Sequence, residues 1–355
     1  MITYVGVLFP TNFQFGPQEH VIFNSVKSQI EQRWPNGNNL LVNLTWFGPQ
    51  FKNGAWEQVQ DLIAKQKTFD RIIWLCAIDP LCVLPQDLTD MEQKLHSKEN
   101  YYVGVGFDGA LSFNTHVYVL LEEFEHYTVD QLKLTEVVYP FVNYNRKPKP
   151  HRIQLAERLN KLDGIVTLGK IDSNYNVNEG MLTDLFIKMT PDISSQEVTH
   201  NGKYTDLTDC GGVPYDLYTL GRLDIWQQHF LNIVSETVYR PWDTTFVTEK
   251  TWKPIIGLRP FLINGQTQIY QWLRDRGFRT FNQYWSHIPV EQATDVTIYD
   301  LIYNVADYLC SLSPEQLQDM WHQMLPDLLH NRQRFFEFAQ EEIYKMNHLF
   351  DESNN

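Results

Sequence analysis

The sequence predicts an α/β protein made of two Rossmann-like domains with parallel sheets that face each other across a cleft, followed by a C-terminal helical segment. Short runs rich in β-branched and aromatic residues alternate with longer amphipathic stretches, and this alternation occurs in both halves of the chain. The length of 355 residues also favours two domains. Parallel sheets of this kind bind ligands beyond the carboxyl ends of their strands.

The first half contains four strand-like runs, at residues 2–9, 40–47, 71–78 and 101–107. Helix-compatible stretches lie between them at residues 19–34 and 56–66, and Ile22, Val26 and Ile30 in the first stretch recur at helical spacing. The opening segment MITYVGVLFP has no charged region and no small-residue cleavage site, so we expect a first strand there and no signal peptide.

The second half repeats the pattern. A strand, a helix and a strand are expected at residues 136–145, 149–162 and 164–170, and a polar stretch at 172–212 indicates loops. A strand at 230–237, a helix at 252–258 and a strand at 260–263 follow. Ser313 is expected to cap a last helix, with Pro314 at its first position. We therefore predict segments 1–132, 133–312 and 313–355.

Composition excludes several classes of protein. Hydrophobic residues make up 43% of the chain, which is enough for sizeable cores, but no apolar run is long enough for a transmembrane helix. The net charge of −14 disfavours a general nucleic-acid binder. The four cysteines form no CxxC motif, which predicts reduced thiols and a cytoplasmic protein without membrane insertion.

Two basic segments stand out in this acidic chain. Residues 139–170 contain seven Lys or Arg and two acids, and residues 240–279 contain seven Lys or Arg and three acids. Each segment spans a predicted strand-to-helix junction, where free N–H groups and the helix dipole favour anions. A small phosphorylated ligand suits this arrangement, although solvated basic faces would look the same in sequence.

The second basic segment carries a motif. The stretch FLNIVSETVYRPWDTTFVTEKTWKPIIGLRPFLING, residues 230–265, resembles the donor-binding segment of the α1,3/4-fucosyltransferase family. Those enzymes have a strand that ends in Glu-Asn or a variant, then Val-Thr-Glu-Lys, a helix and an apolar strand. The matching residues here are Ser235 and Glu236, then residues 246–250, 252–258 and 259–262.

A second motif lies upstream, in FVNYNRKPKPHRIQLAERL at residues 141–159. It resembles the other donor motif of the family, in which a strand ends in Asn and an Arg begins a helix. Asn143, Asn145 and Arg152 match, and Arg146 competes with Arg152. The resemblance covers residues 138–310, about half of the chain. The chain also resembles uncharacterised phage and viral proteins.

The resemblance implies a GT-B fold, in which residues 133–312 hold a GDP- or UDP-sugar and residues 1–132 form the acceptor side. It also implies a glycosyltransferase that inverts the anomeric carbon without an obligatory metal or other cofactor. The sequence has no Asp-x-Asp motif, and the spacing of Asp206 and Asp209 is a weak metal signal. Basic side chains and helix N-termini would then neutralise the leaving diphosphate.

The motif assigns roles to three consecutive residues. Lys250 is expected to contact the diphosphate and Glu249 the ribose hydroxyls, whereas Thr248 is either a ligand or only the N-cap of the helix. The ordinary alternative for Glu249 is a first-turn acid that complements the helix dipole. The alternative for Lys250 is a solvent-facing lysine.

Other contacts are expected to come from nearby segments. Arg152 is suited to a bidentate contact with a phosphate. His151 and Arg146 are candidates to make this contact in its place or together with it. Glu236 at a strand end is expected to hold the sugar or the ribose. Tyr239 and Trp242 in the following loop are candidates to stack on the base or sugar, or to cover a core.

Inverting transfer requires a general base near the acceptor hydroxyl. By the layout of the family it comes from the N-terminal domain, where Asp79 and Asp108 follow predicted strands. Glu19 and His20 come next. An Asp after a strand is also an ordinary turn or helix cap.

Other functions stay open at the level of sequence. For a glycosyltransferase, the sequence leaves two acceptors open: a glycan, or a hydroxymethyl-pyrimidine base in DNA. A second hypothesis is a non-catalytic protein that binds a sugar nucleotide or a glycan. An ordinary phosphatase or kinase is disfavoured because the chain has no GxxxxGK[ST] and no GxGxxG motif.

Overall fold

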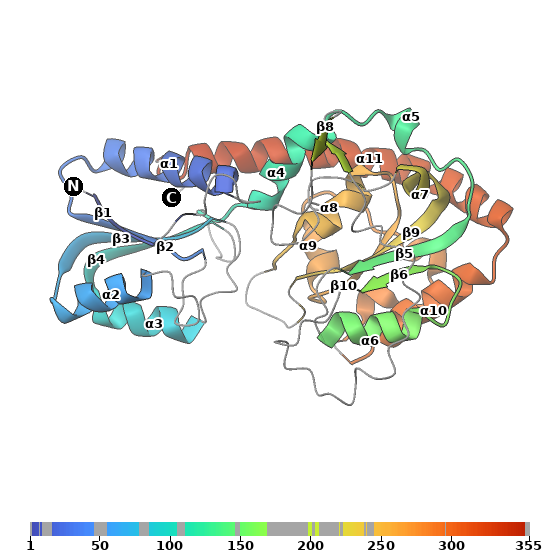
Figure 1. Cartoon of the computed structure of the whole chain (residues 1–355), viewed down its shortest axis with the longest axis horizontal. Coiled ribbons are helices and arrows are strands. Elements are labelled where there is room, and N and C mark those ends of the chain that lie inside the picture. Colours follow the sequence, from blue (N-terminus) through green and yellow to red (C-terminus); the bar gives the residue numbers. More distant parts are fainter. Residues whose placement is uncertain are drawn as a thin grey trace. The chain divides into compact units, whose positions relative to one another are not determined.

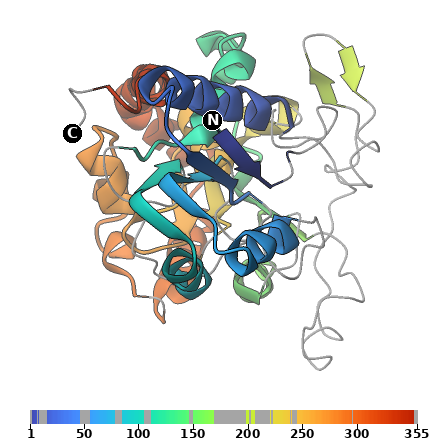
Figure 2. The ribbon, with the colours of Figure 1, turned by 90° about the vertical axis from the view of Figure 1, so that its left-hand side faces the viewer.

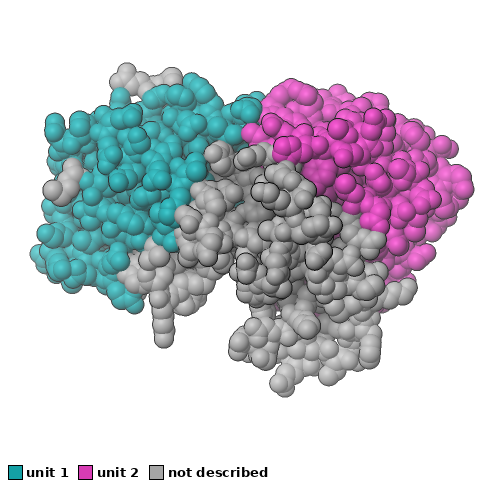
Figure 3. Space-filling model, turned by 45° about the horizontal axis from the view of Figure 1, so that its top comes forward, with its two compact units in different colours: residues 1–119, 339–355 teal, residues 120–338 magenta. Residues whose placement is uncertain are grey.

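The structure is a computed structural model. It describes residues 2–6, 8, 16–45, 55–77, 85–104, 111–145, 150–168, 198–200, 203–205, 220, 223–237, 239, 245–294 and 296–351. The chain forms two compact units (Figure 3): unit 1 comprises residues 1–119 and 339–355, and unit 2 comprises residues 120–338.

Unit 1 is built on a four-stranded parallel sheet with the order β1-β2-β3-β4. Its strands are β1 (Ile2–Val5), β2 (Asn39–Asn43), β3 (Thr68–Cys76) and β4 (His96–Gly104). Its helices are α1 (Gly16–Arg33), α2 (Ala55–Ala64), α3 (Pro85–Lys94) and the first half of α4 (Thr115–Phe124). The four predicted strands and the alternation of strands with helices are confirmed.

Helices cover both faces of this sheet. Side chains alternate along β2, so that Leu41 packs with Val26 of α1 on one face. Leu40 packs with Val59 of α2 on the other face, where α3 also lies. Figures 1 and 2 show α1 on one side of the sheet and α2 and α3 on the other. The end of the chain completes the first face, because Met346 belongs to the cluster that contains α1.

Unit 2 contains the second parallel sheet, with the order β10-β9-β5-β6. The strands are β5 (Tyr139–Asn145), β6 (Ile165–Leu168), β9 (His229–Ser235) and β10 (Phe261–Asn264). Helix α6 (Pro150–Leu159) links β5 to β6, and α8 (Glu249–Ile256) links β9 to β10 (Figure 1). The prediction of α/β architecture with parallel sheets is therefore confirmed in both halves.

Several further elements complete unit 2. The helices are α5 (Val129–Leu132), α7 (Leu223–Gln228), α9 (Ile269–Asp275), α10 (Ile298–Cys310) and α11 (Pro314–Asn347), with 3-10 turns η5 (Asn282–Trp285) and η6 (Val290–Gln292). A short antiparallel pair, β7 (Val198–His200) and β8 (Lys203–Thr205), lies within the stretch for which loops were predicted.

An aromatic cluster holds α8 in place. The fully buried Trp252 of α8 has ring centroids of Phe278, Phe335 and Phe338 within 5.3–5.6 Å, and that of Trp272 on α9 at 6.0 Å. Phe335 and Phe338 belong to α11, so three helices share this contact. The burial of such large side chains fixes the N-terminus of α8 relative to the sheet.

The two units differ in extent from the predicted segments. The division into compact units falls within α4, between residues 119 and 120, whereas the first predicted segment ends at residue 132. Helix α11 begins as predicted: the Ser313 hydroxyl accepts from the N–H of Gln316, and the Gln316 side chain accepts from the N–H of Ser313. Its last residues, from 339 onward, belong to unit 1.

Within the described part of the chain, no helix combines the length and apolar character that crossing a membrane requires. Cys76 and Cys310 are free thiols, which agrees with the prediction of reduced cysteines for these two residues. Cys82 and Cys210 lie outside the described residues.

A buried histidine gives unit 2 a predicted pH dependence. His229, at the start of β9, has its Nδ1 3.0 Å from the carbonyl oxygen of Ile225, and among the described residues its Nε2 has no partner. Burial, followed by the charge of Arg259, lowers the pKa of His229 well below its ordinary value. The unfolded chain therefore binds a proton at this residue below about pH 6.5, and the folded chain does not.

Stability is consequently expected to fall as the pH drops below about 6.5, by up to about 1.4 kcal/mol per pH unit from this residue. In His229→Gln, which retains a donor for the Ile225 carbonyl, the fall should be shallower. Urea unfolding between about pH 5 and about pH 7, followed by tryptophan fluorescence, measures the two slopes. Parallel slopes for wild type and variant would contradict the assignment.

Candidate functional site

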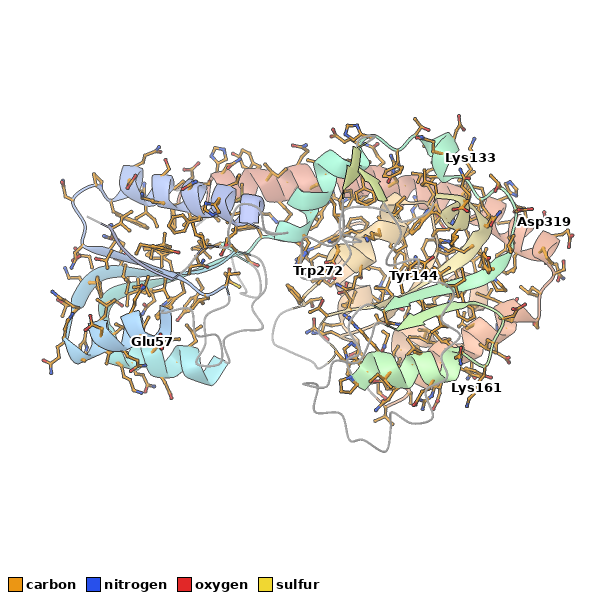
Figure 4. The ribbon with its side chains drawn as sticks, viewed as in Figure 1. Glu57, Lys133, Tyr144, Lys161, Trp272 and Asp319 are labelled. Atoms are coloured by element: carbon orange, nitrogen blue, oxygen red, sulfur yellow. The ribbon has the colours of Figure 1, made fainter. Side chains whose placement is uncertain are left out.

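The candidate site lies at the carboxyl edge of the sheet in unit 2. Parallel pairing brings the ends of neighbouring strands β5, β9 and β10 to one edge, where Asn145, Ser235 and Asn264 are their last residues. All three polar side chains are buried. Figure 4 labels Tyr144, the penultimate residue of β5, which marks this end of the strand.

Glu236 lies directly after β9 and is fully buried. Its Oε1 accepts from the N–H of Thr248 at 3.1 Å and from the hydroxyl of Thr251 at 2.6 Å. Its Oε2 accepts from the hydroxyl of Thr248 at 2.5 Å and from the N–H of Thr237 at 3.1 Å. These bonds tie the end of β9 to the beginning of α8.

Helix α8 begins as its sequence predicts. Thr248 is the N-cap, in extended conformation with φ −107° and ψ −179°, and its hydroxyl accepts from the N–H of Lys250 at 3.4 Å. The N-cap interpretation of Thr248 is thereby confirmed. Because the same hydroxyl donates to Glu236, Thr248 links the cap to the buried carboxylate.

Lys250 and Glu249 form an ion pair at the start of α8. The Glu249 side chain is 6% exposed and that of Lys250 28% exposed, so the pair lies at the border of the protein and solvent. The Lys250 ammonium also lies 3.3 Å from the hydroxyl of Thr237 and 3.4 Å from that of Thr248. The Lys250 ammonium therefore lies at the positive end of the α8 dipole. An anion bound there would be stabilised by the ammonium and by the dipole.

Helix α6 brings the upstream motif to the same place. The Nε2 of His151 lies 3.0 Å from the carbonyl oxygen of Glu236, and Nη2 of Arg152 donates to that oxygen at 3.2 Å. Both side chains are buried or nearly so. The side chain of Asn264, at the end of β10, donates to the carbonyl oxygen of His151 at 3.2 Å. The start of α6 and the end of β9, about 85 residues apart in sequence, thus meet at Glu236.

The asparagines of β5 connect this strand to β9. Asn145 donates to the side-chain oxygen of Asn143 at 2.5 Å. Asn143 in turn donates to the carbonyl oxygen of Ile233 at 2.7 Å and to the hydroxyl of Ser235 at 3.3 Å. Asn145 is therefore part of the buried network that fixes the strand ends.

Tyr239 was a candidate to stack on a base or a sugar. Its ring is stacked on His151, with centroids 5.2 Å apart and planes at 10°, and on Tyr299 at 5.5 Å and 22°. The guanidinium of Arg158 lies 5.4 Å from the ring centroid of Tyr299 and continues the stack. A nucleobase would have to displace one of these rings to stack on Tyr239.

Several predicted residues lie outside the described part of the chain: Asp79, Asp108, Arg146, Asp206, Asp209 and Trp242. Of the other candidates for the base, Glu19 is fully buried and accepts from the side chain of Asn43 at 2.7 Å, at the end of β2 in unit 1. His20 beside it is partly exposed. Among the residues that the structure describes, no group of His, Cys, Asp or Glu is arranged to hold a metal.

Thr237 and Thr251 are the contacts that sequence reasoning missed. Thr251 follows the N-cap by three residues, which places it within the first turn of α8, where its hydroxyl reaches Glu236. A threonine at this position has no signature of its own. The nearest signal is a buried strand that ends in an acid, followed by several hydroxyl residues.

Comparison of the chain with protein-family models, curated proteins and solved structures gives no match in any of the three. The described cations of the site are Arg152, which contacts Glu236, and Lys250, which contacts the next residue, Thr237. Such an arrangement can bind an anion with two separated charges.

Proposed function

We propose that the protein is a glycosyltransferase and that unit 2 binds the diphosphate of its nucleotide-sugar donor. The observation that carries this proposal is the meeting of two distant segments at Glu236 and Thr237. Arg152 donates to the carbonyl oxygen of Glu236, while the ammonium of Lys250 contacts the hydroxyl of Thr237. The two cations flank one dipeptide at the carboxyl edge of a parallel sheet, where such sheets bind nucleotides.

The charges of the site suit a leaving diphosphate. Transfer of the sugar leaves negative charge on the diphosphate, and preorganised cations and N–H groups stabilise that charge. Lys250, Arg152 and the positive end of the α8 dipole supply them. Arg146, Lys147 and Lys149 lie within the upstream motif, ahead of α6 in sequence, and add basic residues to this part of the chain.

The proposal extends to the whole reaction. Two α/β units with parallel sheets are compatible with a GT-B arrangement, and we propose that a GDP- or UDP-sugar is the donor and a hydroxyl of a glycan is the acceptor. Inversion would follow from a single displacement, with the diphosphate charge neutralised by the cations of the chain and without an obligatory metal. The general base is expected from unit 1, where Asp79 and Asp108 remain the candidates.

The test is a binding panel with the whole chain. GDP, UDP, dTDP and CMP, each with a matching sugar donor, are added in thermal unfolding experiments with and without EDTA. At about 100 times its Kd, the correct ligand should stabilise the protein by about 2.7 kcal/mol, equally in both conditions. No stabilisation by any donor or free nucleotide would refute the proposal, and a shift that EDTA abolishes would refute metal independence.

A further inference from the structure

Glu236 lies at the centre of the proposed donor site, and the role inferred for it rests on that proposed function. An acid at a strand end beside a nucleotide is easily assigned as a ligand of ribose or sugar hydroxyls. The structure gives its carboxylate other partners. Two donors reach each oxygen: Thr248 N–H and Thr251 hydroxyl at Oε1, and Thr237 N–H and Thr248 hydroxyl at Oε2.

This set of bonds saturates the carboxylate. An ionised carboxylate offers about four lone-pair sites, and the four donors use them. The side chain is also fully buried. A hydroxyl of a donor would have to displace a threonine to reach it, so direct binding of the substrate by Glu236 is disfavoured.

The backbone of the same residue holds the other half of the site. The carbonyl oxygen of Glu236 accepts from Arg152 at 3.2 Å and lies 3.0 Å from Nε2 of His151. The four hydrogen bonds of the Glu236 carboxylate come from the loop and the beginning of α8, whereas its carbonyl contacts α6. Its amide donates to the carbonyl oxygen of Asn264 at 2.9 Å, which keeps the residue in register with β10.

We propose that Glu236 is a positioning residue that sets the separation between the two cations of the diphosphate site without touching the donor. It acts on Lys250 through Thr237 and Thr248, whose hydroxyls lie 3.3 Å and 3.4 Å from the ammonium. It acts on Arg152 through its own carbonyl. The ligand class is a diphosphate, because a lysine and an arginine held on two consecutive residues offer one cation to each of two linked phosphates.

A purely electrostatic role predicts the opposite sign. A buried carboxylate close to a bound diphosphate repels it, so removal of the negative charge alone would tighten binding. Removal of a positioning residue weakens binding, because the cations are no longer held at the right separation. The neutral and nearly isosteric Glu236→Gln distinguishes the two roles.

Isothermal titration with GDP, UDP and inorganic pyrophosphate provides the measurement. Glutamine retains two acceptor sites but presents an NH₂ group toward one pair of donors, so the amide of Thr237 or the hydroxyl of Thr248 must shift. We expect Glu236→Gln to bind the preferred nucleotide and pyrophosphate about tenfold more weakly than wild type. Equal or tighter binding by a folded variant would overturn the inference.

A double-mutant cycle with Lys250→Ala tests the route of the effect. If Glu236 acts through Lys250, the double variant should bind no more weakly than Lys250→Ala by more than about twofold. Additive losses would mean that the Glu236 side chain does not act through Lys250, which contradicts the proposed route through Thr237 and Thr248. A general loss of structure would instead appear as a changed near-ultraviolet circular dichroism spectrum.

If Glu236→Gln does not fold, a pair of variants at Thr248 tests the positioning role of Glu236 instead. Thr248→Val removes the hydroxyl that joins Glu236 to Lys250, and Thr248→Ser retains it. We expect the valine variant to bind pyrophosphate at least about fivefold more weakly than the serine variant. Equal affinities would overturn the inference, whereas absence of binding by the wild type to every nucleotide and to pyrophosphate would refute the proposed function itself.

Discussion

Lys250→Ala is expected to weaken the binding of a nucleoside diphosphate by about 10- to 100-fold, the range for loss of a hydrogen bond to a charged group. The ammonium of Lys250 lies at the N-terminus of α8, beside Thr237 and Thr248. Its removal takes away a cation and leaves the carboxylate of Glu249, which is 6% exposed, without that partner. Both changes disfavour an anion at this place.

The ligand series shows where the loss arises. If Lys250 contacts the diphosphate, Lys250→Ala should lose the same factor for inorganic pyrophosphate as for the nucleoside diphosphate, and nothing for the nucleoside alone. Isothermal titration measures all three. Lys253→Ala, in the last turn of the same helix, is the matched control and should bind like wild type. Unchanged pyrophosphate affinity in folded Lys250→Ala would remove Lys250 from the site.

The architecture of the chain was accessible from its sequence because local signals agree there. Buried strands such as β2 and β9 coincide with short apolar runs in the sequence, and their residues are buried throughout. Helix α11 begins at the predicted Ser313 and Pro314, since a capping box depends only on neighbouring residues. Helix α8 extends from 249 to 256, three residues earlier than the motif indicated, because its cap is Thr248.

The site was accessible only in part. The two motifs predicted that Arg152 and Lys250 belong to one site. In the structure, Arg152 contacts Glu236 and Lys250 contacts the adjacent Thr237. The saturation of Glu236 could not be predicted, because it depends on the positions of three threonines in three dimensions. The stack of Tyr239 on Tyr299 joins residues 60 positions apart, and no local pattern encodes such a contact.

The limits of the two units could not be predicted from the sequence either, because they depend on contacts between residues far apart in the chain. The last residues of the chain, including Met346 and Leu349, pack in the core that contains α1, more than 300 residues away in sequence. Helical periodicity identified α11 as a helix with a buried face, but it does not reveal what that face packs against. Tertiary partners of an amphipathic helix have to come from the structure.

Arg259→Met is expected to lower the free energy of unfolding by about 3 kcal/mol, in the range for breaking a buried charged network. Arg259 is fully buried after α8, and burial lowers the pKa of its guanidinium to about 9. Backbone carbonyls accept hydrogen bonds from its guanidinium: Nε donates to Trp226 at 3.0 Å, and Nη1 donates to Leu132 at 2.8 Å and to Leu258 at 2.9 Å. The guanidinium thus joins α5, α7 and the turn before β10.

Methionine fills most of the volume of arginine but donates no hydrogen bond, so the carbonyls of Trp226 and Leu132 would lose a donor in the interior. Relief from burying a charge offsets part of this loss, which is why the expected change stays near about 3 kcal/mol and not above it. Arg259→Lys keeps the charge but cannot reproduce the guanidinium fork, and an intermediate loss is expected.

Urea unfolding measures the change, with Arg158→Met as the matched control. Arg158 is 38% exposed and pairs with Asp300, which is 70% exposed, so its replacement should alter stability by less than about 1 kcal/mol. If Arg259→Met unfolds within about 0.5 kcal/mol of wild type, the buried carbonyls have found other donors and the guanidinium is not the link between these elements. A large loss confined to Arg259 would identify it as the residue that fixes the segment leading into β10, and with it the strand end that supports His151 through Asn264.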